Sequence, residues 1–186
     1  MSEEAITKDR TMQEILKAYP GAQRALFARY HIGGCSSCGF EPTETLERVC
    51  ISHNLWVVDE VVIFLRGSQE ADLKARLSPE GLVEVRKAGQ KVEILDVRDP
   101  EEIQQARIEG ARPLTDDLVR EIVERWPKDA FIVLVDHSGE RSMEGAGFLM
   151  SRGFTNIRVL DGGIDAWAAK VDPSMQRYAT TPAHTK

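Results

Sequence analysis

Three cysteines and one histidine in the first third of the sequence have the types and spacing of a reactive or metal-binding group. Cys35 and Cys38 form a Cys-x-x-Cys pair with glycines on both sides, and glycine lets the backbone bend tightly around two thiols. Such a pair suits an intramolecular disulfide, or a thiolate of lowered pKa that exchanges disulfide or persulfide with another molecule. Cys50 and His53 complete the pattern C-x2-C-x11-C-x2-H, whose ligand types also suit a structural zinc ion or an iron–sulfur cluster.

Less reactive roles fit the same four residues. Cysteine is among the most buried residue types, and a histidine at a helix end often caps the helix or faces water. Three hypotheses therefore stand side by side for Cys35, Cys38, Cys50 and His53. They are a redox or persulfide-carrying pair without a cofactor, a zinc or iron–sulfur site, and thiols without chemical function.

A second stretch with chemical potential follows an apolar run. The run from Phe131 to Val135 predicts a strand that is buried on both faces, as in a parallel sheet covered by helices. Such a sheet places its ligand site at the carboxyl end of its strands. The loop there precedes a helix, so its backbone N–H groups suit an anion. The loop residues are Asp136, His137, Ser138, Gly139, Glu140 and Arg141.

Three motifs together resemble a rhodanese homology domain over residues 76–172. They are Asp96-Val97-Arg98 after an earlier strand, the loop 136–141, and the segment 160–167. The resemblance implies a doubly wound α/β fold with a parallel sheet. It also implies a cysteine after the central strand that carries a persulfide, whereas this chain has Asp136. A carboxylate cannot form that persulfide, and we expect Asp136 to turn its charge into the loop's own N–H groups.

The functional role of the loop stays open between two alternatives. One is a retained site for a small anion or a protein partner, and the other is a degenerate loop kept for packing. A phosphoryl acceptor at Asp136 would need a metal site with further carboxylates, for which the sequence has no motif. We expect Asp96 and Arg98 to form a structural ion pair, and Arg141 to attract an anion or pair with Asp136.

Helical patterns precede the α/β region. Thr11 and Glu14 predict a capping box, a second helix is expected over 22–30, Pro42 and Thr43 are expected to open a third, and a fourth is expected over 58–65. This part, about residues 6–66, resembles the small redox-disulfide domain associated with hybrid-cluster proteins. The resemblance implies an all-α fold and redox work but no substrate. We divide the chain into a helical thiol domain (1–66), a linker (67–76), a rhodanese-like domain (77–172) and a disordered tail (173–186).

Charge and hydropathy exclude two classes of partner. The 186 residues carry a net charge of −6, whereas a nucleic-acid-binding protein shows a basic stripe or patch. No stretch approaches a membrane span, and the first four residues are acidic in part where a secretory signal is basic and then apolar. An odd number of cysteines does not make a secreted disulfide framework. We therefore expect a cytoplasmic protein without nucleic-acid or membrane partners.

Two classes of function follow. In the first, the protein is a non-catalytic sulfur or redox adaptor: Cys35 and Cys38 exchange disulfide or persulfide with a sulfur- or redox-handling protein, and the loop binds a partner or a small anion. In the second, it is a sulfurtransferase in which Cys35 or Cys38 replaces the missing nucleophile. A zinc or iron–sulfur protein is the remaining alternative.

Overall fold

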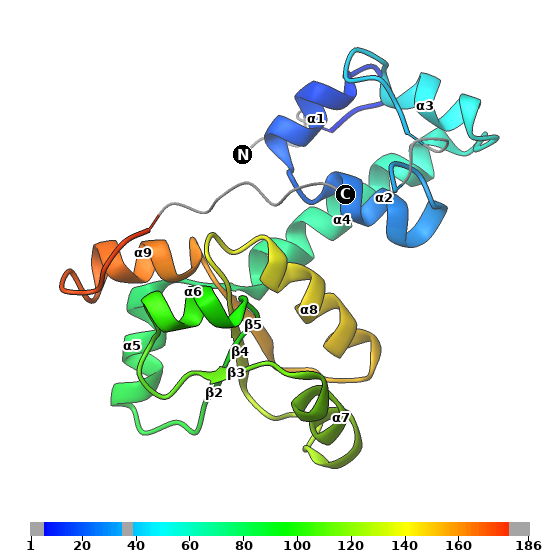
Figure 1. Cartoon of the computed structure of the whole chain (residues 1–186). Coiled ribbons are helices and arrows are strands. Elements are labelled where there is room, and N and C mark those ends of the chain that lie inside the picture. Colours follow the sequence, from blue (N-terminus) through cyan, green and yellow to red (C-terminus); the bar gives the residue numbers. More distant parts are fainter. Residues whose placement is uncertain (1–5, 35–38, 179–186) are drawn as a thin grey trace. The chain divides into compact units, whose positions relative to one another are not determined.

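The chain folds as two compact units, which the computed structural model describes over residues 6–34 and 39–178. The N-terminal unit is Met1–Lys74 and the C-terminal unit is Ala75–Lys186 (Figure 1). Cys35 and Cys38, which carry the redox hypothesis, lie outside the described residues. Residues 179–186 of the expected tail also lie outside them.

The described part of the N-terminal unit is built from helices, in line with the expected all-α domain. Thr11 caps the first helix, and its capping box with Glu14 is confirmed. Apolar side chains from all of these helices meet in one buried cluster that includes Met12, Leu26 and Leu65. The helices are α1 (Met12–Ala18), α2 (Ala22–Tyr30), α3 (Leu46–Ser52) and α4 (Val58–Ala75). The last residue of α4, Ala75, is the first residue of the C-terminal unit.

Two helix boundaries differ from the sequence-based expectation. The third helix does not open at Pro42 and Thr43, because Thr45 is its N-cap and accepts a hydrogen bond from the Arg48 N–H. The fourth helix does not end at Leu65 but continues to Ala75. Of the segment expected as a linker, 67–76, residues 67–75 are therefore helical and Arg76 begins the first strand. The division into units falls inside this segment.

A polar cluster holds the second half of α4 in the N-terminal unit. The buried Tyr19 hydroxyl donates to Asp72 Oδ2 at 2.8 Å, and Arg24 pairs with the same oxygen. Burial and the Asp72 carboxylate raise the pKa of Tyr19. Side-chain anchoring of this kind stabilises a polar helical segment that has no strong apolar periodicity of its own.

Replacing Asp72 with alanine should destabilise the N-terminal unit. The substitution leaves the buried Tyr19 hydroxyl without its acceptor, so the free energy of unfolding should fall by about 1–3 kcal/mol. Hydrogen exchange of the α2 amides measures this change. Glu70 of the same helix is exposed, and Glu70→Ala should change the free energy by less than about 0.5 kcal/mol. Equal effects of the two substitutions would contradict the anchoring role.

The C-terminal unit contains a parallel sheet of five strands among the described residues, which confirms the expected α/β class. The strand order is β1-β5-β4-β2-β3, and each neighbouring pair is parallel. Pairing of Leu134 with Leu95 on one side and Val159 on the other sets the register of the central strand. The strands are β1 (Arg76–Leu77), β2 (Glu93–Asp96), β3 (Arg112–Pro113), β4 (Ile132–Val135) and β5 (Ile157–Leu160).

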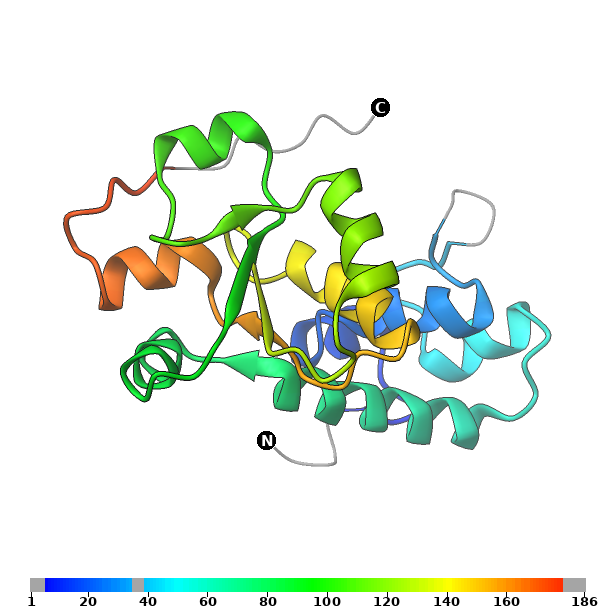
Figure 2. The same ribbon diagram turned by 90° about the horizontal axis from the view of Figure 1, so that it is seen from below.

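Helices cover both faces of the sheet (Figures 1 and 2). Alternate side chains of β2 point to opposite faces, so Leu95 packs in the cluster with α7 and α8, and Ile94 packs in the cluster with α5 and α9. The helices are α5 (Pro79–Lys87), α6 (Pro100–Gln105), α7 (Asp116–Arg125), α8 (Arg141–Ser151) and α9 (Gly163–Lys170). Within the described ranges, no helix combines the length and the apolar character that a membrane crossing requires.

Candidate functional site

The two loops singled out in the sequence lie at the same edge of the sheet. Strands β2 and β4 are adjacent and parallel, and Asp96 pairs in register with Val135. The Val97 N–H donates to the Val135 carbonyl at 2.9 Å, which continues the pairing past the end of β2. The segment 96–98 and the loop 136–141 therefore leave the sheet side by side.

Asp136 fills the loop with its own carboxylate. The side chain is 1% exposed. Its Oδ1 accepts from the Gly139 N–H at 2.6 Å and from the Ser142 hydroxyl at 3.0 Å, and its Oδ2 accepts from the Arg141 N–H at 2.7 Å. The expectation that Asp136 turns its charge into the N–H groups of the loop is confirmed. The buried carboxylate therefore accepts hydrogen bonds from two N–H groups of its own loop and from the hydroxyl at the start of α8.

The start of α9 packs directly against the loop backbone. The Ile164 N–H donates to the Asp136 carbonyl at 2.9 Å, and the Asp165 N–H donates to the His137 carbonyl at 3.3 Å. Gly163 has φ of +58°, and a Cβ there would lie 2.4 Å from both of those carbonyl oxygens. Only glycine combines this backbone conformation with so close an approach.

Asp96 and Arg98 form a buried ion pair, as expected. Arg98 Nε donates to Asp96 Oδ1 at 2.9 Å and Nη2 donates to Oδ2 at 2.6 Å, a bidentate arrangement. The Arg98 side chain is fully buried and also donates to the Ala106 carbonyl at 2.7 Å. Burial opposes the charge of Arg98, but the Asp96 carboxylate outweighs it and raises the pKa of the guanidinium. The pair is a structural centre that joins β2 to the chain after α6.

Tyr178 is a site residue that the sequence analysis missed. Its hydroxyl accepts from Arg98 Nη1 and donates to Glu102 Oε1 at 3.3 Å, and its ring lies 4.9 Å from the ring of His137. Residues 173–178 were expected to be disordered, but Met175 and Tyr178 pack against the apolar cluster of this face. Two isolated apolar residues in a polar stretch give no periodic signal, although an aromatic residue in an expected tail was a usable hint.

Arg141 pairs with carboxylates other than Asp136. Its Nη2 donates to Glu102 Oε2 at 2.7 Å, and its Nη1 lies 3.6 Å from Asp99 Oδ2. Only its backbone N–H reaches Asp136. Burial raises the pKa of Glu102, but hydrogen bonds from Arg141 and from the Asp99 N–H outweigh burial and lower it. The Arg141 side chain therefore has carboxylate partners within the protein, Glu102 and Asp99.

The lowered pKa of Glu102 predicts a small loss of stability in acid. A carboxyl whose folded pKa lies below its ordinary value of 4.5 stabilises the fold above that value, and this contribution is lost as pH falls through the folded pKa. At about pH 7, Glu102→Gln should therefore lower the free energy of unfolding by about 0.5–1 kcal/mol. At about pH 3 the difference between the variant and the parent should be smaller than at about pH 7, because the contribution of the carboxylate decreases as pH falls below 4.5. Denaturant unfolding at both pH values measures the difference, and a gap that grows in acid would contradict the sign.

The structure places Cys50 and His53 at the end of α3, with unlike surroundings. Cys50 is fully buried in the apolar cluster, and burial followed by the charge of Glu47 raises the pKa of its thiol to about 11. His53 Nδ1 lies 2.9 Å from the Val49 carbonyl, so it carries a proton and caps the helix. Among the described residues there is no group of three or more candidate metal ligands. The pairing of these two residues with Cys35 and Cys38 stays a prediction.

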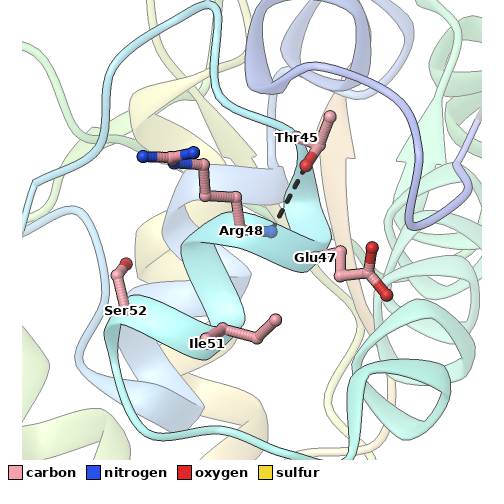
Figure 3. A pocket seen from close by; sticks show the side chains of 5 residues that line it. All are labelled: Thr45, Glu47, Arg48, Ile51 and Ser52. Atoms are coloured by element: carbon pink, nitrogen blue, oxygen red, sulfur yellow. Dashed lines mark hydrogen bonds between the residues drawn. The ribbon is translucent and has the colours of Figure 1, made fainter.

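A surface depression of about 530 Å³ lies along the outer side of α3 (Figure 3). Thr45, Glu47, Arg48, Ile51 and Ser52 line it, and Figure 3 shows the Thr45 hydroxyl accepting from the Arg48 N–H. Its described lining residues contribute neither a thiol nor an imidazole. Apart from Ile51, its described lining is therefore polar or charged.

The sheet edge defines the class of the C-terminal unit. The parallel sheet lies between two helical layers, which is the arrangement of a doubly wound α/β domain. Such a domain has its site at the carboxyl ends of the strands, and here the N–H groups of the loop after β4 converge on one carboxylate. The sequence profile of the rhodanese-like domain matches residues 69–170. This is more than half of the chain, and the protein belongs to the rhodanese-like family.

Similar proteins share this domain. The chain is 33% identical over 94 residues to "Thiosulfate sulfurtransferase GlpE" of Pseudomonas putida, covering 50% of this chain and 84% of that protein. It is 34% identical over 104 residues to "Probable adenylyltransferase/sulfurtransferase MoeZ" of Mycobacterium tuberculosis, covering 55% of this chain and 26% of that protein. A solved rhodanese-related protein from Thermoplasma volcanium shows 27% identity, a TM-score of 0.42, and coverage of 52% of this chain and 92% of that one.

Proposed function

We propose that the protein is a non-catalytic rhodanese-like adaptor in sulfur or redox handling, in which Cys35 and Cys38 exchange disulfide or persulfide with a partner protein. The family and the sulfurtransferases among its relatives support work related to sulfur transfer. The resemblance of residues 6–66 to a redox-disulfide domain supports a thiol role for the N-terminal unit. The cytoplasm, which the sequence favours, is a compartment where such thiols stay reduced.

The single observation that carries the proposal is the buried Asp136 carboxylate. Thiosulfate:cyanide transfer needs a thiolate that attacks the sulfane sulfur of thiosulfate; the S–S bond breaks, and sulfite leaves with the electron pair. Cyanide then takes the outer sulfur from the persulfide as thiocyanate and returns the thiolate. A carboxylate at this position forms no persulfide, and Asp136 already occupies the N–H groups of Gly139 and Arg141.

The same charge favours a protein partner over a small anion at the loop. An incoming anion would meet a buried negative charge and would compete for donors that Asp136 already holds. A protein surface needs no such donors, because it can contact the exposed side chains of Ser138 and Glu140. We therefore assign the loop edge to partner docking and the sulfur chemistry to the N-terminal thiols.

Two measurements on the intact protein test the proposal. In the thiosulfate:cyanide assay, thiocyanate should form no faster than with the Cys35→Ser/Cys38→Ser double variant. After incubation with inorganic polysulfide, mass spectrometry should find added sulfur on the peptide that contains Cys35 and Cys38. Cys50→Ser is the matched control, because Cys50 is buried and its thiol pKa is raised, so removing it should change neither result.

Turnover that disappears with Cys35→Ser or Cys38→Ser would reject the adaptor and establish the sulfurtransferase. Absence of both turnover and added sulfur would reject both sulfur functions. The zinc or iron–sulfur alternative would require Cys50 to leave the apolar core as a thiolate, which its burial opposes. Elemental analysis and the visible spectrum of anaerobically purified protein test it: stoichiometric zinc, or an absorption band that Cys50→Ser abolishes, would replace the redox pair.

A further inference from the structure

The chain after α9 turns back toward the loop edge. Ser174 donates its N–H to Asp172 Oδ1 at 3.2 Å, and the Met175 N–H donates to the Asp172 carbonyl at 3.0 Å, which closes a tight turn. Met175 then packs against the apolar cluster that includes Ile164 and Trp167. The turn therefore aims the following residues at the carboxyl edge of the sheet.

Two side chains fix the segment to that edge. Arg177 makes a bidentate pair with Asp165, with Nε to Oδ1 at 2.7 Å and Nη2 to Oδ2 at 2.8 Å. Tyr178 places its ring 4.9 Å from the ring of His137 and its hydroxyl on Arg98 and Glu102. One short segment thus contacts the loop 136–141, the segment after β2 and the first turn of α9.

The attachment is weak enough to be reversible. In the Arg177–Asp165 pair the side chains are 60% and 37% exposed, and a pair that water and salt can reach contributes little to stability. His137 Nδ1 is buried and has no hydrogen-bond partner among the described residues, so the closed arrangement carries an unmet polar group. The hydrogen bonds of Tyr178 to Arg98 and Glu102 favour the closed state, and the exposed pair and the unpaired nitrogen leave it able to open reversibly.

We propose that residues 174–178 form a releasable strap that closes over the Asp136 loop and limits access to His137. The consequence for function rests on the proposed adaptor role: a partner that docks on Ser138 and Glu140 must displace Tyr178 before it can also contact His137. Release also removes the Tyr178 hydrogen bond from Glu102 and leaves the Asp165 carboxylate at the start of α9 without Arg177. The strap therefore regulates the docking face without any change at the N-terminal thiols.

Site-resolved modification of histidines by diethyl pyrocarbonate, read by mass spectrometry of the full chain, tests the strap. Arg177→Ala removes only an exposed pair, and it should raise the rate at His137 about fivefold, the factor expected from losing one such pair. Tyr178→Ala should raise the rate further, because it also uncovers the imidazole ring. His31 and His53 belong to the N-terminal unit and serve as internal references whose rates should not change.

Gln176→Ala is the matched control within the strap, because Gln176 is exposed and makes no side-chain hydrogen bond in the described part of the chain. An unchanged His137 rate in both Arg177→Ala and Tyr178→Ala would overturn the proposal, as would an equal increase with Gln176→Ala. Since this readout involves no sulfur chemistry, it can succeed or fail independently of the thiosulfate and polysulfide tests.

Discussion

Replacing Arg98 with alanine is expected to lower the free energy of unfolding of the C-terminal unit by about 3–5 kcal/mol. The substitution leaves the Asp96 carboxylate buried, at 1% exposure, without its bidentate partner. It also removes the donors to the Ala106 carbonyl and to the Tyr178 hydroxyl. Hydrogen exchange of the β2 and β4 amides measures the change in this unit alone.

An exposed ion pair provides the control for Arg98. Arg120 pairs with Asp117 on the surface of α7, where their side chains are 70% and 91% exposed. Arg120→Ala should change the free energy of unfolding by less than about 0.5 kcal/mol. If Arg98→Ala cost no more than this control, Asp96 would have to be satisfied by other groups, and the buried pair would not organise the site.

Replacing Asp136 with alanine should lower the free energy of unfolding of the same unit by about 2–4 kcal/mol. The N–H groups of Gly139 and Arg141 and the hydroxyl of Ser142 lose their shared acceptor. The amide exchange of Gly139 and Arg141 should accelerate more than that of β4, because the hydrogen bonds that hold these two amides are removed directly.

Two further variants separate charge from shape at Asp136. Asp136→Asn keeps one acceptor oxygen but turns an amide NH2 toward backbone donors. Its free energy of unfolding should therefore lie between that of the parent and that of Asp136→Ala. Asp129 is an exposed carboxylate in the turn before β4, and Asp129→Ala should have an effect of less than about 0.5 kcal/mol. A loop that tolerates Asp136→Ala as well as Asp129→Ala would show that its N–H groups do not depend on this carboxylate.

Strong local patterns made much of the fold predictable. The apolar run before Asp136 predicted a strand buried on both faces, and Ile132–Val135 is fully buried at the centre of a parallel sheet. The capping box at Thr11 and the Asp96–Arg98 pair were predictable because the contacting residues are close in sequence. The hydrogen bonding of Asp136 was predictable for the same reason, because its partners lie within six positions of it in the sequence.

Features that depend on distant contacts were not predictable from the sequence. The polar residues 67–75 have little apolar periodicity, and their helix is held by Asp72 against Tyr19, 53 positions away. Strands β1 and β3 have two residues each, which is too short for any pattern. Tyr178 contacts Arg98 across 80 positions, so nothing near it in sequence marks it as part of the site.

The crossing of Gly163 over the Asp136 loop limits how this domain can be redesigned. A library that seeks to install sulfurtransferase activity by placing cysteine at position 136 should hold position 163 as glycine, because any Cβ there would collide with two carbonyl oxygens. Sequence diversity belongs instead at Ser138 and Glu140, whose exposed side chains can change without disturbing the backbone crossing. Mutational tolerance around this loop should therefore be high on its solvent side and nearly absent where it meets α9.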